Sequence, residues 1–189
     1  MIFITGGAGY IGSHTCVELL SAGQQVTVFD NFSNSQPEAL ARVERITGHK
    51  VTFVEGDIRD QAALQTALQA SGAKAVIHFA GLKAVGESVA QPLRYYDNNV
   101  LGTLKLLQAM QACDVKTLVF SSSATVYGDP QRLPLTEDHP LSATNPYGQT
   151  KLVIENMLRD LNTSDPSWRI GILRYFNPVG AHASGLIGE

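Results

Sequence analysis

Thr5-Gly6-Gly7-Ala8-Gly9-Tyr10-Ile11-Gly12 is a glycine-rich turn that directly follows the apolar run Ile2–Thr5. Glycine recurs at positions 6, 9 and 12, and the turn also satisfies the pattern G-x-G-x-x-G from Gly7 to Gly12. After a strand, such a turn lets the backbone approach a pyrophosphate and aims the free N–H groups of the next helix at it. The pattern alone also suits an ordinary turn, so the surrounding sequence decides its meaning.

Short β-branched or aromatic runs alternate with longer helical patterns on the C-terminal side of this turn. Strands are expected over residues 2–5, 25–29, 51–54, 75–80, 117–122 and 170–175, and helices over 11–22, 37–47, 61–71, 92–112 and 146–161. Gly23, Gly48 and Gly72 follow three of these helices and suit left-handed C-caps. The order predicts an α/β fold, a doubly wound Rossmann-like parallel sheet of about six strands, with the ligand at their carboxyl ends.

The composition narrows the possible functions. The chain has 189 residues, of which 44% are apolar and 16% charged, and its net charge is −3. These values predict a well-filled core and argue against nucleic acid or an anionic membrane as partner. Cys16 and Cys113 lie far apart, no targeting segment precedes the first strand, and the five histidines lack metal-ligand spacing. A cytoplasmic protein without a metal site is therefore expected.

A carboxylate ends the second expected strand. Asp30 follows the glycine turn at the distance where an acidic side chain accepts hydrogen bonds from the ribose hydroxyls of an adenine dinucleotide. The same carboxylate would repel a 2′-phosphate and no arginine adjoins it, so NAD is favoured over NADP. Asp57 follows the third strand at the same edge of the sheet, where it could reach the adenine.

A tyrosine and a lysine stand four residues apart in Asn145-Pro146-Tyr147-Gly148-Gln149-Thr150-Lys151. Asn145 and Pro146 suit the start of a helix, so Tyr147 and Lys151 should share one helix face. An ammonium there can stabilise a phenolate and lower its pKa. The run Ser121-Ser122-Ser123 ends the fifth strand and supplies a hydroxyl at the same edge. Each feature alone has an unremarkable explanation, a solvated helix face or local hydrogen bonding, and gains weight from the others.

Six blocks of sequence together resemble one family. They are Thr5–Gly12, Phe79-Ala80-Gly81-Leu82-Lys83-Ala84-Val85-Gly86-Glu87-Ser88, Tyr95-Tyr96-Asp97-Asn98-Asn99, Ser121–Gly128, Tyr147–Lys151 and Leu173-Arg174-Tyr175-Phe176-Asn177-Pro178-Val179-Gly180-Ala181. The chain resembles the extended short-chain dehydrogenase/reductases, and among them the nucleotide-sugar epimerases. The glycine turn and the Tyr-x-x-x-Lys pattern identify the superfamily, whereas the blocks from Phe79 and Arg174 are more particular.

The resemblance implies roles for individual residues. Tyr147 would be the catalytic base and acid, Lys151 would hold the nicotinamide ribose and lower the pKa of Tyr147, and Ser123 would hydrogen-bond the reacting sugar hydroxyl. The sugar nucleotide would also contact Lys83 and Asn177. The residues implied to contact NAD are Gly6, Gly9, Tyr10, Ile11, Gly12, Asp30, Asn31, Phe32, Ser33, Asn34, Ser35, Asp57, Ile58, Phe79, Ala80, Gly81, Leu82, Lys83, Asn98, Lys151 and Phe176.

The implied activity is that of an isomerase. It is NAD-dependent epimerisation at C4 of UDP-hexoses, which interconverts UDP-galactose and UDP-glucose in galactose metabolism through a 4-keto intermediate. A nucleotide-sugar 4,6-dehydratase is an alternative that the sequence disfavours, because Ala124-Thr125-Val126 stands where dehydratases resembling this chain have an acidic pair. A non-catalytic NAD-binding module is the other alternative.

The resemblance also implies a domain organisation. Residues 1–177 would form the NAD-binding domain, and residues 178–189 would begin a substrate-binding part that lies mostly beyond Glu189. The chain is therefore expected to be an N-terminal portion of such an enzyme. A homodimer is implied as well, paired through the helices at 92–112 and 146–161.

Overall fold

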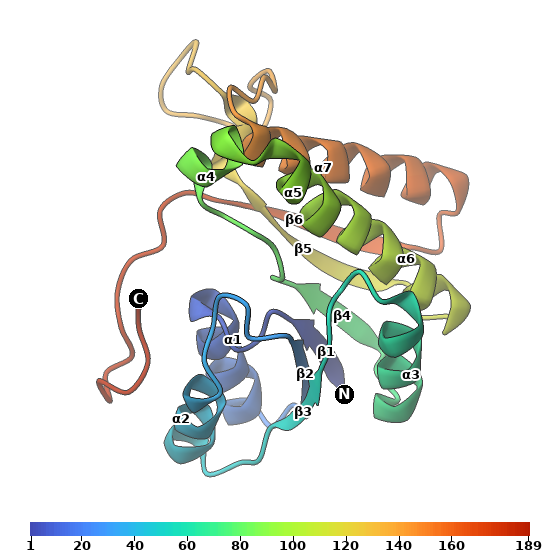
Figure 1. Ribbon diagram of the computed structural model, residues 1–189, viewed down its shortest axis with the longest axis vertical. Helices are drawn as coiled ribbons and strands as arrows, with labels where there is room; N and C mark the ends of the chain where they lie inside the picture. The colour runs from blue at the N-terminus through green and yellow to red at the C-terminus, as the bar shows by residue number, and fades with distance from the viewer.

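A six-stranded parallel sheet forms the centre of the protein in a computed structural model that describes residues 1–189 (Figure 1). Its strand order is β3-β2-β1-β4-β5-β6, so the chain reverses direction across the sheet after β3. The strands are β1 (Ile2–Thr5), β2 (Val26–Asp30), β3 (Thr52–Glu55), β4 (Ala75–His78), β5 (Thr117–Ser123) and β6 (Arg169–Tyr175). The predicted doubly wound fold is confirmed, with each strand within two residues of its expected bounds at either end.

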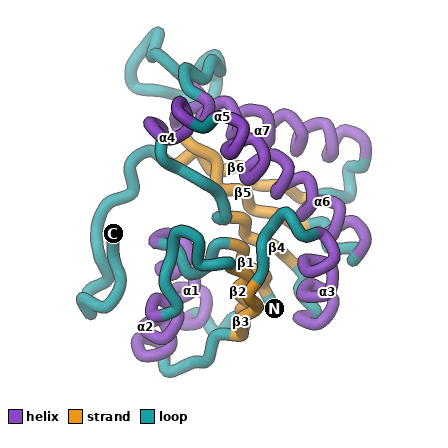
Figure 2. Tube along the Cα trace, viewed as in Figure 1, coloured by secondary structure: helices purple, strands orange, loops and turns teal.

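Helices cover both faces of the sheet (Figure 2). On one face, α1 (Tyr10–Ser21) and α2 (Glu38–Thr47) pack around a core that contains Ile4 and Val28. On the other face, α3 (Gln61–Ser71), α6 (Gly102–Ala112) and α7 (Pro146–Ser164) enclose a larger core around Phe3 and Phe120. Phe3 and Ile4 adjoin in β1 yet belong to different cores, because successive side chains of a strand point to opposite faces.

Three helical segments differ from the expectation. The helix expected over 92–112 consists of α5 (Pro92–Tyr95), the π-helical η1 (Tyr96–Leu101) and α6, because a local widening interrupts the α-helical pattern. The short helices α4 (Val85–Ala90) and η2 (Ala124–Tyr127) were not predicted. Both are too short to show a helical period in the sequence.

The glycine turn is required by packing within the fold itself. Gly6 has a φ of +71°, and a Cβ atom there would lie 2.5 Å from the backbone nitrogen of Ala80. A Cβ atom at Gly12 would lie 2.3 Å from the carbonyl oxygen of Gly6. These approaches leave no room for a side chain, so α1 begins close against the end of β1.

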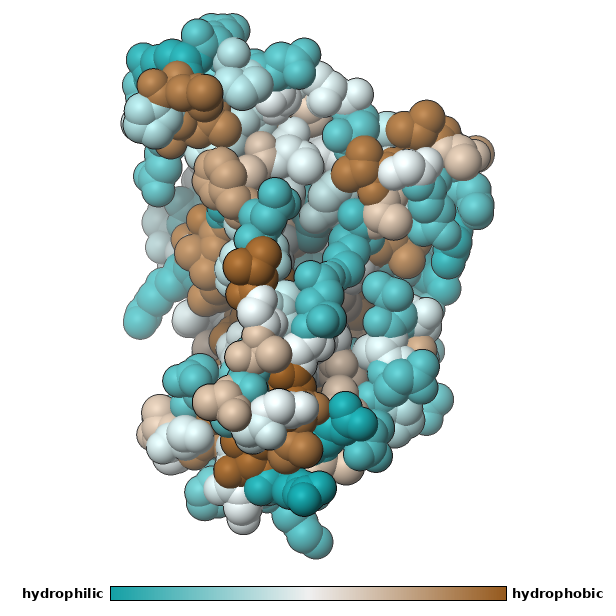
Figure 3. Space-filling model, turned by 90° about the vertical axis from the view of Figure 1, so that its left-hand side faces the viewer, coloured by the Kyte–Doolittle hydropathy of each residue, from teal (hydrophilic) through white to brown (hydrophobic).

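The C-terminal segment, residues 176–189, returns from β6 to the α1–α2 side of the molecule (Figures 1 and 2). Ile187 is buried in the core beneath α1 and α2, and the carbonyl oxygen of Leu186 accepts a hydrogen bond from Arg42. Figure 3 views the molecule from the side of this segment, where hydrophobic and hydrophilic side chains are interspersed. At the edge of the sheet, β6 packs against α7, and its residue Leu173 is 46% exposed. None of the helices combines the length and the apolar character that a membrane span requires.

Candidate active site

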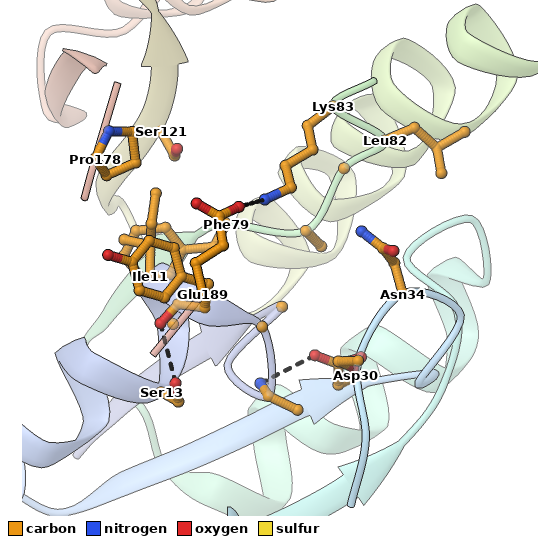
Figure 4. A pocket seen from close by; sticks show the side chains of 18 of the residues that line it. Ile11, Ser13, Asp30, Asn34, Phe79, Leu82, Lys83, Ser121, Pro178 and Glu189 are labelled. Carbon is orange, nitrogen blue, oxygen red and sulfur yellow. Dashed lines mark hydrogen bonds and ion pairs between the residues drawn. The ribbon is translucent and has the colours of Figure 1, made fainter. Parts of the chain in front are cut away.

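A cavity of about 1120 Å³ opens at the carboxyl ends of the strands. It exceeds the roughly 300–1,000 Å³ of ordinary small-molecule sites and suits an extended ligand. Figure 4 shows Ser121 and Pro178 at one end and Asp30 and Asn34 at the other. The residues singled out in the sequence that line it are Gly6, Gly9, Tyr10, Ile11, Gly12, Asp30, Asn31, Ser33, Asn34, Ser35, Ile58, Phe79, Ala80, Gly81, Leu82, Lys83, Asn98, Ser123, Tyr147, Lys151, Phe176 and Asn177.

Two singled-out residues, Phe32 and Asp57, do not line the cavity. The ring of Phe32 packs against that of Phe53 at the edge of the sheet, with 4.8 Å between the centroids. Asp57 forms an ion pair with Arg59 at 2.6 Å, and hydrogen bonding from Arg59 is the main cause that lowers the pKa of its carboxyl. Sequence position placed both residues near the cavity, whereas their side-chain partners hold them outside its lining.

Asp30 connects two walls of the cavity through hydrogen bonds of its carboxylate. One carboxylate oxygen accepts a hydrogen bond from the backbone nitrogen of Ala8 at 3.0 Å, within the glycine turn (Figure 4). The other oxygen accepts from the backbone nitrogen of Phe32 at 2.9 Å and from the hydroxyl of Ser35 at 3.0 Å. Because a carboxylate can accept about four hydrogen bonds, Asp30 retains capacity for a ligand.

The first turn of α1 presents an uncompensated positive helix end to the cavity. Gly9 is its N-cap residue, no side chain caps the helix, and the first turn contains no acidic residue. The N-terminal N–H groups and the helix dipole therefore favour an anion. This end of α1, the close-packed glycines and the carboxylate of Asp30 together fit the pyrophosphate and ribose of an adenine dinucleotide.

The start of α7 fixes Tyr147 at the opposite end of the cavity. Asn145 caps the helix by accepting a hydrogen bond from the backbone nitrogen of Gly148 at 2.9 Å, and Pro146 is its first residue. The backbone nitrogen of Tyr147 donates to the hydroxyl of Ser88 in α4 at 3.1 Å. Tyr147 is thereby held beside Ser123, the last residue of β5.

Burial is the largest influence on the pKa values of Tyr147 and Lys151 at this end of the cavity. It raises the pKa of Tyr147, and the Ser123 side chain opposes that shift. Burial also lowers the pKa of Lys151 to about 8. The Lys151 ammonium donates to the carbonyl oxygen of Ser121 at 2.7 Å and lies 5.9 Å from the centroid of the Tyr147 ring. In this arrangement desolvation is the largest cause acting on the Tyr147 hydroxyl, so its pKa lies above the ordinary value.

The depressed pKa of Lys151 predicts a pH dependence of stability. The unfolded chain retains the lysine proton up to the ordinary value of 10.5, whereas the folded chain releases it from about 8. Lys151 should therefore contribute a rise of stability with pH across that interval. In Lys151→Met this contribution should disappear, and stability at pH 7 should increase by roughly 3 kcal/mol. Urea unfolding of both proteins at a series of pH values measures the free energy of unfolding. An equal dependence of that free energy on pH in the two proteins would contradict the depressed pKa of Lys151.

Asn99 is a structural member of the site that sequence inspection missed. Its side chain is buried, accepts from the backbone nitrogen of Leu82 at 2.8 Å and donates to the Leu82 carbonyl oxygen at 3.0 Å. It also donates to the hydroxyl of Thr150 and accepts from the neighbouring Asn98. The sequence shows two adjacent asparagines, and only the π-helical turn of η1 reveals which one faces inward.

The C-terminal segment supplies further lining that the sequence did not indicate. Pro178, Val179 and residues 186–189 line the cavity together with Arg42 of α2. Glu189 forms an ion pair with Lys83 at 2.9 Å, and both side chains are 56% exposed. Such an exposed pair contributes little to stability, so an anionic ligand can replace Glu189 as the partner of Lys83. Phe176, 63% exposed, and Asn177 lie at the open side of the site.

Comparison with known proteins agrees with this geometry. The chain is 62% identical over 188 residues to a UDP-glucose 4-epimerase of Bacillus subtilis and 60% identical over 195 residues to one of Mus musculus. It resembles a crystal structure of UDP-glucose 4-epimerase from Bifidobacterium longum in complex with NAD+ and UDP, with a TM-score of 0.98 and 56% identity. In each case all of this chain is covered but only 56% of the other protein.

The chain thus spans about half the length of the curated relatives it matches. The model of a known family nevertheless matches almost the whole of this chain, over residues 2–188. The glycine turn, the strand order and the tyrosine–lysine pair at the cavity all fall within that range. The chain belongs to the NAD dependent epimerase/dehydratase family.

Proposed function

We propose that the protein interconverts UDP-galactose and UDP-glucose by NAD-dependent epimerisation at C4. The observation that carries this proposal is the meeting of Tyr147, Lys151 and Ser123 at one end of a cavity whose other end suits a dinucleotide. Identity of 62% to a UDP-glucose 4-epimerase supports the choice of reaction. The absence of an acidic pair after Ser123 disfavours a 4,6-dehydratase.

NAD is the cofactor in this proposal. When bound, it would accept a hydride from C4 of the sugar and return it to the opposite face. The glycine turn and the first turn of α1 would hold its pyrophosphate, Asp30 its adenosine ribose, and Lys151 its nicotinamide ribose. The remaining cofactor contacts named from the sequence are part of the proposal, with Phe32 and Asp57 as the weakest members because they do not line the cavity.

Tyr147, Ser123 and Lys151 would have separate roles in moving the proton of the sugar hydroxyl. Tyr147 would take the proton from the C4 hydroxyl and later return it, while the Ser123 hydroxyl orients that group. Because burial raises the pKa of Tyr147, a cation near its ring is needed for it to act as a base at neutral pH. Lys151 supplies that charge from the next turn of α7. Lys83 and Asn177 would hold the sugar nucleotide.

The cofactor choice is tested at Asp30. Asp30→Asn keeps the shape of the side chain but removes its charge, so NAD should bind about tenfold more weakly, as for one lost charge-assisted hydrogen bond. NADP should be rejected less strongly, because the repulsion of its 2′-phosphate is gone. Calorimetric titration with both dinucleotides measures this. Asp57→Asn is the matched control with a smaller expected loss, and an equal loss in the two variants would contradict the role of Asp30.

The reaction itself is tested on two proteins. One is the 189-residue chain, and the other is a chimera that continues it with the part of the Bacillus subtilis relative beyond the 56% it covers. Released NAD is measured by absorbance after denaturation, and interconversion of UDP-galactose and UDP-glucose by chromatography. We expect NAD in both proteins and turnover in the chimera. A 4-keto-6-deoxy product would indicate a dehydratase, and NAD without turnover in either protein would indicate a binding module.

A homodimer is proposed through the outer surface of α5, η1 and α6, with α7 beside it. Leu93 is 82% exposed there, and Leu101 and Leu104 are exposed as well. Exposed apolar residues of this kind are typical of protein interfaces. Leu93→Lys combined with Leu104→Lys should convert a dimer to a monomer in sedimentation equilibrium. A monomeric unmodified protein would contradict this proposal.

Two further parts of the proposal concern context. Residues 1–177 would be the cofactor domain and residues 178–189 would lead into a substrate-binding part, as in an N-terminal portion of a longer enzyme. A reducing cytoplasm and galactose metabolism would be its setting. Cys16, which is buried, and Cys113 are both free thiols, which is consistent with that compartment.

A further inference from the structure

Glu155 is a buried charge that the proposed reaction does not use. Its side chain is fully buried in α7, one helical turn beyond Lys151. It accepts hydrogen bonds from the hydroxyl of Ser122 at 2.6 Å, from Arg159 at 2.7 Å, and from two nitrogens of Arg174 at 3.0 and 2.8 Å. Burial alone would raise the pKa of this carboxyl, but the bonds from Arg174, Ser122 and Arg159 outweigh it and lower the pKa. Glu155 is therefore ionised in the folded protein.

The partners of Glu155 belong to the elements that carry the proposed reacting groups. Ser122 immediately precedes Ser123 in β5, and Arg174 lies in β6, three residues before Asn177. Arg174 also donates to the Tyr127 hydroxyl of η2 at 3.0 Å, with its guanidinium 4.8 Å from that ring centroid. One carboxylate and one guanidinium thus connect α7, β5, β6 and η2 beneath the cavity.

The residues of α7 that contact β5 are spaced so that their positions depend on one another. Tyr147, Lys151 and Glu155 follow one another at intervals of four residues, so they share a helix face. That face meets the three serines of β5: Tyr147 lies by Ser123, Lys151 donates to the Ser121 carbonyl, and Glu155 accepts from Ser122. A shift of α7 along β5 would break the Glu155 contact and misplace the other two together.

A contribution to folding stability is a weak explanation for the buried charge of Glu155. A buried ion pair often contributes no more to folding than apolar residues of the same volume, because desolvating the charges costs about as much as their attraction returns. Apolar packing tolerates small displacements, however, whereas a carboxylate with four directed hydrogen bonds defines one register. We propose that Glu155, paired with Arg174, is a positioning residue that sets the register of α7 on β5 and so places Tyr147 and Lys151 opposite Ser123.

The test uses Glu155→Gln, which keeps the size of the side chain but loses the ion pair. The first expected result rests on the proposed function: NAD should bind about tenfold more weakly, which corresponds to the loss of one charge-assisted hydrogen bond from Lys151. We also expect a displaced ring-carbon resonance of Tyr147 in the tyrosine-labelled 189-residue chain without ligand, identified by its absence in Tyr147→Phe. This second readout requires neither cofactor nor turnover, so failure of the proposed function does not decide it.

Leu158→Ala is the matched control, since Leu158 is buried on the same helix one turn further from Tyr147. It should lower the melting temperature without moving the Tyr147 resonance or the NAD affinity. Equal changes in the two variants at equal loss of melting temperature would overturn the proposal. If Glu155→Gln does not fold, the apolar double variant Glu155→Met with Arg174→Met replaces it, because no unpaired charge is then buried. Unchanged NAD affinity and an unmoved Tyr147 resonance there would equally overturn the proposal.

Discussion

Tyr147→Phe is expected to lower kcat for interconversion of UDP-galactose and UDP-glucose by about 10³-fold, within the usual range for removing a general acid–base group. The loss follows from geometry, because the hydroxyl beside Ser123 is the group placed to move the C4 proton. NAD should remain bound, since none of its proposed contacts needs that hydroxyl. Coupled assay of whichever protein turns over, with NAD measured after denaturation, gives both quantities.

A second tyrosine of the same cavity controls for this result. Tyr175 lines the wall at the end of β6, and burial raises its pKa as it raises that of Tyr147. Tyr175→Phe removes an equivalent hydroxyl without a proposed part in proton transfer, so kcat should change little. Retained turnover in Tyr147→Phe, or an equal loss in both variants, would reject Tyr147 as the base.

Gly12→Ala is expected to reduce folding stability and cofactor binding together. Its Cβ atom would lie 2.3 Å from the Gly6 carbonyl oxygen and 2.7 Å from the Cα atom of Gly7. Backbone atoms cannot turn aside as a side chain can, so α1 must move away from the glycine turn. We expect destabilisation by about 3 kcal/mol, the upper end of ordinary overpacking. NAD affinity should fall roughly 10²-fold, as for two lost charge-assisted hydrogen bonds at the helix end.

Gly86→Ala provides the comparison for this variant. A Cβ atom at Gly86 in α4 would meet no atom within 4 Å, so unfolding in urea should show a neutral or slightly stabilising change. Both variants replace glycine by alanine within a helix, and only the approach of the neighbouring backbone differs. Gly12→Ala with wild-type stability and NAD affinity would contradict the packing argument.

The sequence was sufficient where the signal is local. Alternation of apolar runs with helical periods determined the six strands and their parallel arrangement, because a strand joined to the next by a helix has few ways to return to the sheet. Glycine spacing determined the turn before α1, since only glycine accepts the backbone approach at Gly6 and Gly12. Four-residue spacing placed Tyr147 and Lys151 on one face of α7.

Contacts between distant segments were decided only by the tertiary structure. Sequence position indicated Asp30 as a ribose contact and Asp57 as an adenine contact at the same edge of the sheet. Asp30 does join two walls of the cavity, but Asp57 pairs with Arg59 and does not line it. The inward orientation of Asn99 depends on a π-helical turn, and the depressed pKa of Lys151 depends on burial. The joining of Glu155 to Ser122 and Arg174 requires three elements to pack together. Local periodicity fixes which residues share a strand or helix face, whereas ionisation and hydrogen-bond partners depend on what the folded chain brings against that face.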